Sequence, residues 1–340
     1  MEIIAFGTHL SRFHGYTVDE ITRQGFEVKY RIYSMLLHDD AGSISSAYAL
    51  TALKFSDFWS QHQNDFDWVF CLGDRYEMAA AVASGIPLNI RFAHIHGGET
   101  TLGAIDNIYR HSISLASKLH FVALEEYKRR IKEIVGEEDN CFTIGSLSLD
   151  NLHDLKLLSI AAFKEKWNID LDLPSVLVTV HPETVDYNSN FLFAKETLIA
   201  LSEIVTEKQL IVTMPNADTS GSIFRNMFLE LKEIYPDKIH LIENFGTQSY
   251  FTCMKYVDYL LGNTSSGIIE AASFNKFVIN LGDRQKGRIT GDNVIHVPFK
   301  ANSIIEAVKF EFKNKQIKNN LYYKSGAAKE IIKVIKNNAE

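Results

Sequence analysis

The sequence is poor in cysteine and has no long apolar run. Its 340 residues contain three cysteines, Cys71, Cys141 and Cys253, and no Cys-x-x-Cys pair. Because Cys71 and Cys141 lie in apolar segments, we expect reduced, mostly buried thiols of a cytoplasmic protein. No apolar stretch reaches the roughly 18 residues that a membrane helix requires. The first residues, MEIIAF, also lack the basic stretch of a signal peptide.

A long basic run is missing as well. The chain has 35 Lys and Arg against 42 Asp and Glu, which gives a formal net charge of −7. A nucleic-acid-binding protein needs a basic face that neutralises phosphates, so the charge argues against nucleic acid as a partner. Local basic residues can still hold a small phosphorylated ligand. The length favours two domains over one.

Apolar segments of strand length alternate with amphipathic segments of helix length in the first half. The pattern predicts strands over 1–6, 26–32, 68–72, 91–95, 119–123 and 142–144, and helices over 18–25, 43–62, 76–84, 107–117 and 125–135. Residues 68–72 form a continuous apolar run, which is typical of a buried parallel strand. Strand alternating with helix predicts a parallel sheet covered on both faces.

A linker helix and connection over 150–172 precedes a second alternating series. Strands are predicted over 175–180, 210–214, 239–242, 257–261, 276–280 and 294–296, and helices over 190–205, 222–234, 247–254, 267–273 and 327–336. We therefore predict two doubly wound, Rossmann-like α/β domains over 1–155 and 156–325, and a C-terminal helix within 326–340. Two such domains would face each other across a cleft at the carboxyl ends of their strands.

A polar turn, Gly73-Asp74-Arg75, follows the apolar run at 68–72. The glycine allows a tight turn, Asp74 can act as acid or base, and Arg75 can reach a phosphate. A helix-capping Asp74 beside a surface Arg75 fits this turn equally well.

A second polar cluster, His94-Ile95-His96-Gly97-Gly98-Glu99, follows the next strand. Both histidines point to one face of the strand, but a third metal ligand at convincing spacing is missing. An acid/base His96 beside Glu99 fits better than a metal site, and His94 fits a hydrogen-bonded core histidine. Asp106 starts the next helix, where the helix dipole can stabilise it. Its closeness to His96 makes a catalytic role at least as reasonable.

The second half carries polar loops after three predicted strands. His181 follows the strand at 175–180, either facing the cleft or as a polar loop residue. The segment 262–270 offers helix-start N–H groups with Thr and Ser hydroxyls, which suit a diphosphate better than a Ser-rich cap alone explains. Glu270 can accept from both hydroxyls of a ribose. Arg284 and Arg288 add positive charge on the following loop, although a lone basic loop is usually solvated.

Six segments together carry a specific resemblance: GDRYE, HIHGGETTLGAIDNIYRH, VTVHPET, TMPNADTSG, LGNTSSGIIEA and INLGDRQKGR. They resemble the hydrolysing UDP-N-acetylglucosamine 2-epimerases of sialic-acid and legionaminic-acid synthesis, over a span from Ile3 to about Val297. The resemblance implies a GT-B-like fold and elimination of UDP to a glycal, which water then hydrates with inversion at C2. It also implies a homo-oligomer, a dimer or tetramer, and chemistry that needs neither NAD nor a metal.

The resemblance implies roles for individual residues. Asp74 and Asp106 match the family's catalytic carboxylates and His181 its cleft histidine, with His96 and Glu99 as further catalytic candidates. Positions that contact the UDP-sugar are occupied here by His9, Arg75, Asn216, Phe245, Thr264, Ser265, Ser266, Glu270 and Arg284.

Two departures from the family pattern change what we expect. His96 stands where some members carry Glu, so the sugar can differ, and a UDP-2,4-diacetamido-2,4,6-trideoxy sugar is an alternative to UDP-GlcNAc. The family also begins with another strand and an Arg-bearing loop, whereas Met1 here enters what matches its second strand. We expect a gap beside that strand and poor activity of the 340-residue chain.

Other functions remain open on the sequence alone. A GT-B glycosyltransferase would share the fold and the diphosphate site, but it would not need Asp74, His96 and Asp106 to converge on C2 of the sugar. A non-catalytic UDP-sugar binder would bind UDP without turnover. A non-hydrolysing epimerase would return the epimerised UDP-sugar instead of releasing UDP.

Overall fold

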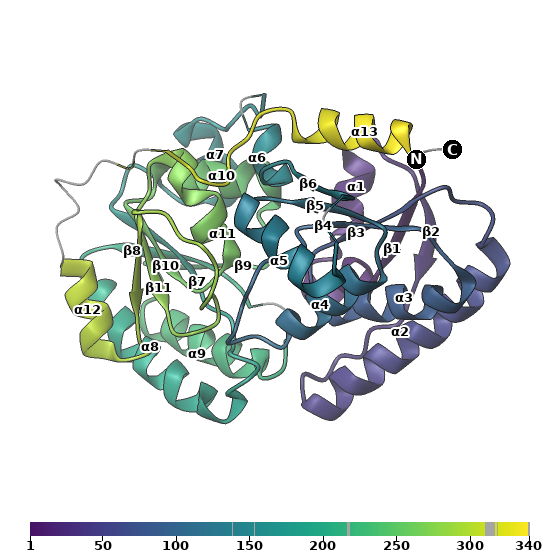
Figure 1. The fold of residues 1–340 in the computed structure, drawn as a ribbon. Coiled ribbons are helices and arrows are strands. Elements are labelled where there is room, and N and C mark those ends of the chain that lie inside the picture. Colours follow the sequence, from purple (N-terminus) through teal and green to yellow (C-terminus); the bar gives the residue numbers. More distant parts are fainter. Residues whose placement is uncertain (138, 153, 216–217, 310–316, 318, 339–340) are drawn as a thin grey trace. The chain divides into compact units, whose positions relative to one another are not determined.

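The computed structural model describes residues 1–340 except 138, 153, 216–217, 310–316, 318 and 339–340. The chain forms two compact units (Figure 1). Unit 1 comprises Met1–Thr101, Ile105–His153 and Tyr322–Glu340, and unit 2 comprises Leu102–Ala104 and Asp154–Leu321. All three cysteines are buried. Within the described ranges, no helix combines the length and apolarity needed to cross a membrane.

Unit 1 contains two parallel sheets flanked by helices. The smaller sheet pairs β1 (Ile3–Phe6) with β2 (Val28–Ile32). The larger has the order β3-β4-β5-β6, formed by Val69–Leu72, Phe92–Ile95, Leu119–Val122 and Cys141–Thr143. Its helices are α1 (Val18–Arg23), α2 (Ala41–His62), α3 (Tyr76–Gly85), α4 (Asp106–Ala116), α5 (Glu125–Val135), α6 (Leu147–Asp150) and α13 (Ala327–Asn337).

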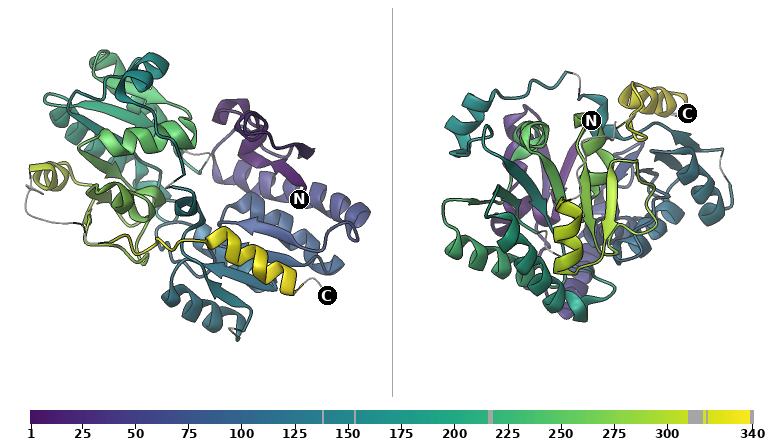
Figure 2. Two further views of the ribbon diagram at one scale, coloured as in Figure 1. Left: turned by 90° about the horizontal axis from the view of Figure 1, so that it is seen from above. Right: turned by 90° about the vertical axis from the view of Figure 1, so that its left-hand side faces the viewer.

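Apolar clusters cover both faces of the larger sheet. On one face Phe92 of β4 packs with Phe55 and Trp59 of α2. On the other face Ala93 packs with Ile331 of α13, because successive strand residues point to opposite faces. Figure 2 shows α13, in yellow, lying along unit 1. The end of the chain therefore completes the core of the unit in which the chain begins.

The sheet of unit 1 is interrupted between β1 and β3. Among the strands of the described residues, none pairs with the second edge of β1 or with the second edge of β3. The gap predicted from the sequence is therefore present. Side chains still join the two parts, since Phe6 of β1 contacts Phe55 of α2 at 4.8 Å between ring centroids, and Phe55 belongs to the same cluster as Cys71 of β3.

The prediction that β3 is a fully buried strand is wrong. Cys71 faces the cluster beneath α2 and has no exposed surface, but Phe70 is 44% exposed and Leu72 is 56% exposed. These two side chains point to the opposite face of a strand that has a single strand neighbour among the described residues. An apolar sequence suited to the interior of a sheet thus lies at an open edge.

Unit 2 contains one six-stranded parallel sheet of order β12-β11-β10-β7-β8-β9. Its strands are β7 (Ser175–Thr179), β8 (Gln209–Thr213), β9 (Ile239–Ile242), β10 (Tyr259–Gly262), β11 (Val278–Leu281) and β12 (Val294–Val297). Its helices are α7 (Ile160–Trp167), α8 (Asn190–Ile204), α9 (Gly221–Ile234), α10 (Gly246–Tyr256), α11 (Ser265–Ile269) and α12 (Ala301–Lys309), of which α12 was not predicted.

The strand order in unit 2 reverses at the central pair of strands, β7 and β10. The chain winds outward to β9 on one side of this pair and to β12 on the other, which is the doubly wound order of dinucleotide-binding sheets. In sheets of this kind ligands bind beside the carboxyl ends of the strands at the reversal. The loops after β7 and β10 are therefore the first place to look for a ligand site.

A buried histidine joins three elements of unit 1. His94 of β4 lies with Nε2 at 2.8 Å from the carbonyl oxygen of Gly73 and Nδ1 at 3.0 Å from Oγ of Ser114 on α4. A carbonyl can only accept, so Nε2 carries the proton, and Nδ1 faces the Ser114 hydroxyl, which also lies within hydrogen-bond distance of the Arg110 carbonyl oxygen at 3.1 Å. Burial lowers the pKa of His94 to about 3, and the core histidine predicted from the sequence is confirmed.

The open edge of β3 predicts a pattern of amide exchange. Val69 and Gly73 donate their backbone N–H groups to the segment 91–95, at 2.9 and 3.1 Å, so the alternate N–H groups of Phe70 and Leu72 face the unpaired edge. In native-state hydrogen exchange followed by NMR, we expect the amides of Phe70 and Leu72 to exchange at least tenfold faster than that of Cys71. Equal protection would show that this edge is covered in solution.

Neutral burial of His94 predicts a pH dependence of stability. The pKa of His94 in the folded protein, about 3, lies below its ordinary value of 6.5. The contribution of His94 to the free energy of unfolding is therefore fully present above pH 6.5 and is lost as the pH falls towards 3. The loss from this one group is about 1.4 kcal/mol per pH unit. Urea unfolding between pH 7 and 4 should show a shallower pH slope for His94→Gln than for the wild type. His38→Gln, at an exposed position, should leave the slope unchanged, and a slope unaltered by His94→Gln would contradict the assignment.

Candidate functional site

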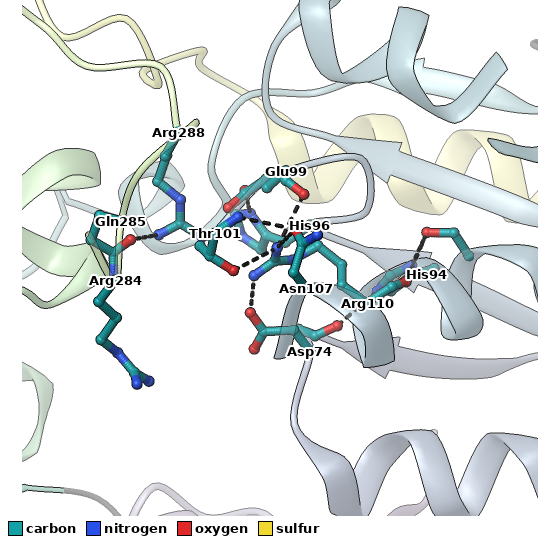
Figure 3. Close-up of polar contacts among 12 residues, drawn as sticks. Asp74, His94, His96, Glu99, Thr101, Asn107, Arg110, Arg284, Gln285 and Arg288 are labelled. Carbon is teal, nitrogen blue, oxygen red and sulfur yellow. Dashed lines mark hydrogen bonds and ion pairs between the residues drawn. The ribbon is translucent and has the colours of Figure 1, made fainter. Parts of the chain in front are cut away.

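The buried guanidinium of Arg110 organises the polar residues of unit 1. Arg110 lies on α4 and is 1% exposed. Its Nη2 forms an ion pair with Asp74 in the turn after β3. Its Nη1 donates to the backbone oxygen of Glu99 at 3.0 Å and to Oγ1 of Thr101 at 3.1 Å (Figure 3). One side chain therefore fixes the Asp74 carboxylate and the loop between β4 and α4.

A half-buried His96 and a buried Glu99 form a pair in that loop. His96 Nδ1 lies 3.0 Å from Oε1 of Glu99, which is 1% exposed. A carboxylate only accepts, so Nδ1 of His96 donates its N–H to Glu99. Nε2 is then the ring nitrogen that is left to exchange a proton with a ligand. His96 adopts a φ of 66°, in the left-handed region that few residues other than glycine occupy. The backbone is therefore held in an unusual turn where the two side chains meet.

The two glycines between His96 and Glu99 are required by space. A Cβ on Gly97 would lie 2.9 Å from Nδ1 of His94, and a Cβ on Gly98 would lie 2.4 Å from the backbone oxygen of Tyr127. Gly98 also has a φ of 75°. The Gly-Gly pair thus lets the loop turn tightly against β4 and α5.

Asp106 is the first residue of α4, as predicted. It precedes Arg110 by four residues, so both side chains lie on the same face of the helix. The next residue, Asn107, accepts from the backbone N–H of Thr101 through Oδ1 at 3.0 Å. The start of α4 is therefore tied to the same loop that carries His96 and Glu99.

Arg75 is held by a carboxylate that the sequence analysis passed over. Nε and Nη2 of Arg75 donate to the two oxygens of Glu77 at 3.1 and 3.3 Å, and Glu77 is buried. Gly7 packs against Glu77, with a Cβ position 3.1 Å from Cγ of that side chain. His9, two residues further on, is exposed and its Nδ1 lies 2.7 Å from Oγ1 of Thr17.

In unit 2, His181 is fixed at the reversal of strand order. Asn263, which follows β10, accepts from the backbone N–H of His181 through Oδ1 at 2.7 Å and donates to its backbone oxygen through Nδ2 at 2.9 Å. Both residues are buried. A Cβ on Gly262 would lie 1.8 Å from the backbone oxygen of Thr179, so only glycine fits there. The carboxyl ends of β7 and β10 are thereby joined through the His181 backbone.

The predicted anion-binding segment forms a one-turn helix after β10. Thr264 caps α11, with Oγ1 accepting from the backbone N–H of Ser266 at 3.4 Å. Ser265 is exposed at the start of this turn, whereas Glu270 at its end is buried. The residues predicted for a diphosphate and a ribose therefore lie within one short segment beside β7.

The two arginines of the basic loop in unit 2 are buried instead of solvated, whereas Lys286 between them is exposed. Arg284 donates to the backbone oxygen of Pro182 at 2.8 Å and forms an ion pair with Asp218 at 3.0 Å. Gln285 donates to the backbone oxygen of Asn263 at 2.8 Å and accepts from Arg288 at 3.0 Å (Figure 3). These bonds join the loop after β11 to the loops after β7 and β10.

Two further predicted nucleotide positions have different outcomes. The ring of Phe245 is buried and packs against Phe163 and Trp167, at 5.6 and 4.7 Å between ring centroids. The Phe245 ring is therefore not available to a ligand, and only the Phe245 backbone could contact one. Asn216 lies outside the described residues.

A tripeptide from the loop before α4 belongs to unit 2. Leu102 donates its backbone N–H to Lys286 at 2.9 Å, and Gly103 donates to Asp283 at 3.1 Å. The backbone oxygen of Gly103 accepts from Thr184 at 3.2 Å. A Cβ on Gly103 would lie 2.5 Å from the backbone of Asp283. Gly103 therefore joins the loop after β7 to the loop after β11.

The residues that hold the predicted ones in place carry little signal in the sequence. These residues are Glu77, Arg110 and Asn263, and their partners lie 2, 36 and 82 residues away in the chain, respectively. Sequence spacing cannot predict the two long-range pairs. Glu77 alone had a local signal, since it follows Arg75 by two residues. In the part of the chain that the structure describes, no three His, Cys, Asp or Glu side chains are grouped to hold a metal ion.

A sequence model of the family described as UDP-N-acetylglucosamine 2-epimerase matches residues 1–336. The chain is 36% identical over 295 residues to the GDP/UDP-N,N'-diacetylbacillosamine 2-epimerase (hydrolyzing) of Campylobacter jejuni, a match that covers 87% of this chain and 76% of that protein. It is 33% identical over 330 residues to the UDP-N,N'-diacetylbacillosamine 2-epimerase (hydrolyzing) of Legionella pneumophila, covering 97% of this chain and 86% of that protein.

Solved structures agree on the fold. The crystal structure of UDP-GlcNAc 2-epimerase from Neisseria meningitidis bound to UDP-GlcNAc matches with a TM-score of 0.77 at 17% identity, over 96% of this chain and 90% of that one. The prediction of two Rossmann-like α/β units is confirmed, with unit 1 interrupted between β1 and β3. By its sequence over residues 1–336, the chain belongs to the UDP-N-acetylglucosamine 2-epimerase family.

Proposed function

We propose that the protein is a hydrolysing UDP-sugar 2-epimerase that releases UDP and the C2-inverted 2-acetamido sugar. The observation that carries this proposal is the Arg110 network, which holds Asp74 and the His96–Glu99 loop together in unit 1. Removing a proton from C2 needs a base positioned within hydrogen-bond reach, and a fixed carboxylate and a hydrogen-bonded His–Glu pair are suited to proton transfer.

The proposed substrate carries a second acetamido group. Two relatives at 36% and 33% identity are named for N,N'-diacetylbacillosamine, whereas the UDP-N-acetylglucosamine 2-epimerase of Neisseria meningitidis is 26% identical over 309 residues. We therefore favour a UDP-2,4-diacetamido-2,4,6-trideoxy sugar over UDP-GlcNAc, which was the first expectation from the sequence.

The proposed reaction has two steps. In the first, a base takes the C2 proton, its electron pair forms the C1–C2 double bond, and the C1–O bond breaks with its electrons leaving on UDP. In the second, water adds its hydroxyl to C1 of the glycal and gives its remaining proton to a base, while an acid delivers a proton to C2 on the face opposite to the one that lost its proton. The two steps need two proton-transfer groups on different faces of the ring, and we assign them to Asp74 or Asp106 and to His96.

Unit 2 is assigned to the nucleotide. The α11 segment with Thr264 and Ser265 offers N–H and hydroxyl groups to the diphosphate, and Glu270 accepts from the ribose hydroxyls. Arg284 supplies positive charge, and His181 donates to the departing diphosphate, where charge develops as the C1–O bond breaks. These roles rest on the placement of all five residues beside the carboxyl ends of β7, β10 and β11.

The products formed in heavy water test the function and the substrate together. Incubation with the diacetamido UDP-sugar and, separately, with UDP-GlcNAc in D2O should release UDP and a C2-inverted sugar carrying one deuterium at C2, as seen by NMR. Turnover is expected to be at least tenfold faster for the diacetamido sugar. Release of UDP only after an acceptor is added would instead identify a glycosyltransferase, and an epimerised UDP-sugar would identify a non-hydrolysing enzyme.

The His96–Glu99 pair predicts unequal effects of two amide substitutions. His96→Gln removes the proton-transfer group, so turnover should fall by about 10²- to 10⁴-fold. Glu99→Gln keeps an oxygen that can accept from Nδ1, so turnover should fall by about tenfold. Single-turnover assays of UDP release measure both rates. The reverse order would show that Glu99, and not His96, transfers the proton.

A further inference from the structure

Glu183 is a buried carboxylate that the proposed chemistry does not use. It follows His181 and Pro182 in the loop after β7 and is 5% exposed. Its backbone is anchored on both sides by Asn190 at the start of α8, with Glu183 N–H donating to Oδ1 at 3.0 Å and Nδ2 donating to the Glu183 oxygen at 2.8 Å. The position of this side chain is thus set by the helix behind it.

The Glu183 carboxylate holds the backbone of the loop after β11. Oε1 accepts from the N–H of Asp283 at 2.6 Å. Gly282, with a φ of 65°, gives it room, because a Cβ there would lie 2.3 Å from Oε1. Burial raises the pKa of Glu183, and the backbone N–H of Asp283 opposes that rise. The pocket around the carboxylate is therefore tight and has a defined donor.

The peptide on the other side of Asp283 is fixed as well. The carbonyl oxygen of Asp283 belongs to the peptide bond that leads into Arg284, and it accepts from the N–H of Gly103 at 3.1 Å. Glu183 on the N–H and Gly103 on the carbonyl therefore clamp the residue immediately before Arg284. With both peptide planes held, the direction in which Arg284 leaves the backbone is determined.

We infer that Glu183 is a positioning residue, which acts through the Asp283 backbone to hold Arg284 where it binds a diphosphate. This inference rests on the proposed function, in which Arg284 contacts UDP. It predicts that Glu183 contributes to UDP affinity through Arg284 alone, without touching the nucleotide.

A double-mutant cycle on UDP binding tests this role. Calorimetry should show that Glu183→Ala raises the Kd for UDP at least tenfold and that Arg284→Ala does the same. The double variant should bind like Arg284→Ala alone, because Glu183 has nothing left to position. Glu183→Gln, which keeps an oxygen acceptor in the same space, should stay within about threefold of the wild type.

A matched control separates positioning from general stability. Glu196 accepts from the backbone N–H of Ala301 at 2.7 Å, so Glu196→Ala removes a similar bond elsewhere in unit 2 and should leave UDP affinity unchanged. If Glu183→Ala does not fold, Glu183→Asp withdraws the acceptor by one methylene and should give the same loss. Additive losses in the double variant would overturn the inference alone. A wild-type protein that does not bind UDP would overturn the proposed function and the inference with it.

Discussion

A single buried cation sets the arrangement of unit 1. The guanidinium of Arg110 is removed from water, and an uncompensated charge at such a position would cost several kcal/mol. The structure compensates it with the Asp74 carboxylate, the Glu99 carbonyl and the Thr101 hydroxyl. Because a guanidinium is planar and its N–H groups point in fixed directions, these acceptors must lie close to its plane and along those directions. The turn after β3 and the loop after β4 are shaped by that requirement.

Unit 2 reaches a comparable rigidity through backbone groups. Its polar side chains, Asn263, Glu183 and Gln285, each bind a main-chain atom of a different loop. The loops after β7, β10 and β11 are therefore joined to one another by hydrogen bonds from side chains to backbone atoms.

The sequence predicts the elements of both units because their signals are local. Apolar runs and amphipathic segments mark nearly every strand and helix, although α6 (Leu147–Asp150) and α12 (Ala301–Lys309) were not predicted. The predicted gap in unit 1 is also present, since it follows from the order of strands in a doubly wound sheet. The exposure of Phe70 and Leu72 does not follow from their own sequence, because burial of a strand depends on its neighbours.

The candidate site is predictable in its members but not in its connections. Asp74, His96 and Asp106 stand out because acids and histidines cluster after strands. Asp74 and Arg110 are 36 residues apart, and neither segment contains a sequence pattern that predicts this ion pair. Long-range pairs of this kind depend on how the elements pack, which sequence patterns leave undetermined.

The exchange of segments between the units has a consequence for how the chain matures. Leu102–Ala104 is made before the strands of unit 2 but belongs to unit 2, and Tyr322–Glu340 is made after those strands but belongs to unit 1. During synthesis, unit 1 lacks the apolar face of α13 until the whole of unit 2 has been translated, and unit 2 packs around a tripeptide translated before its own strands. Neither unit corresponds to one continuous stretch of the gene, so a single cut in the coding sequence cannot release either of them whole.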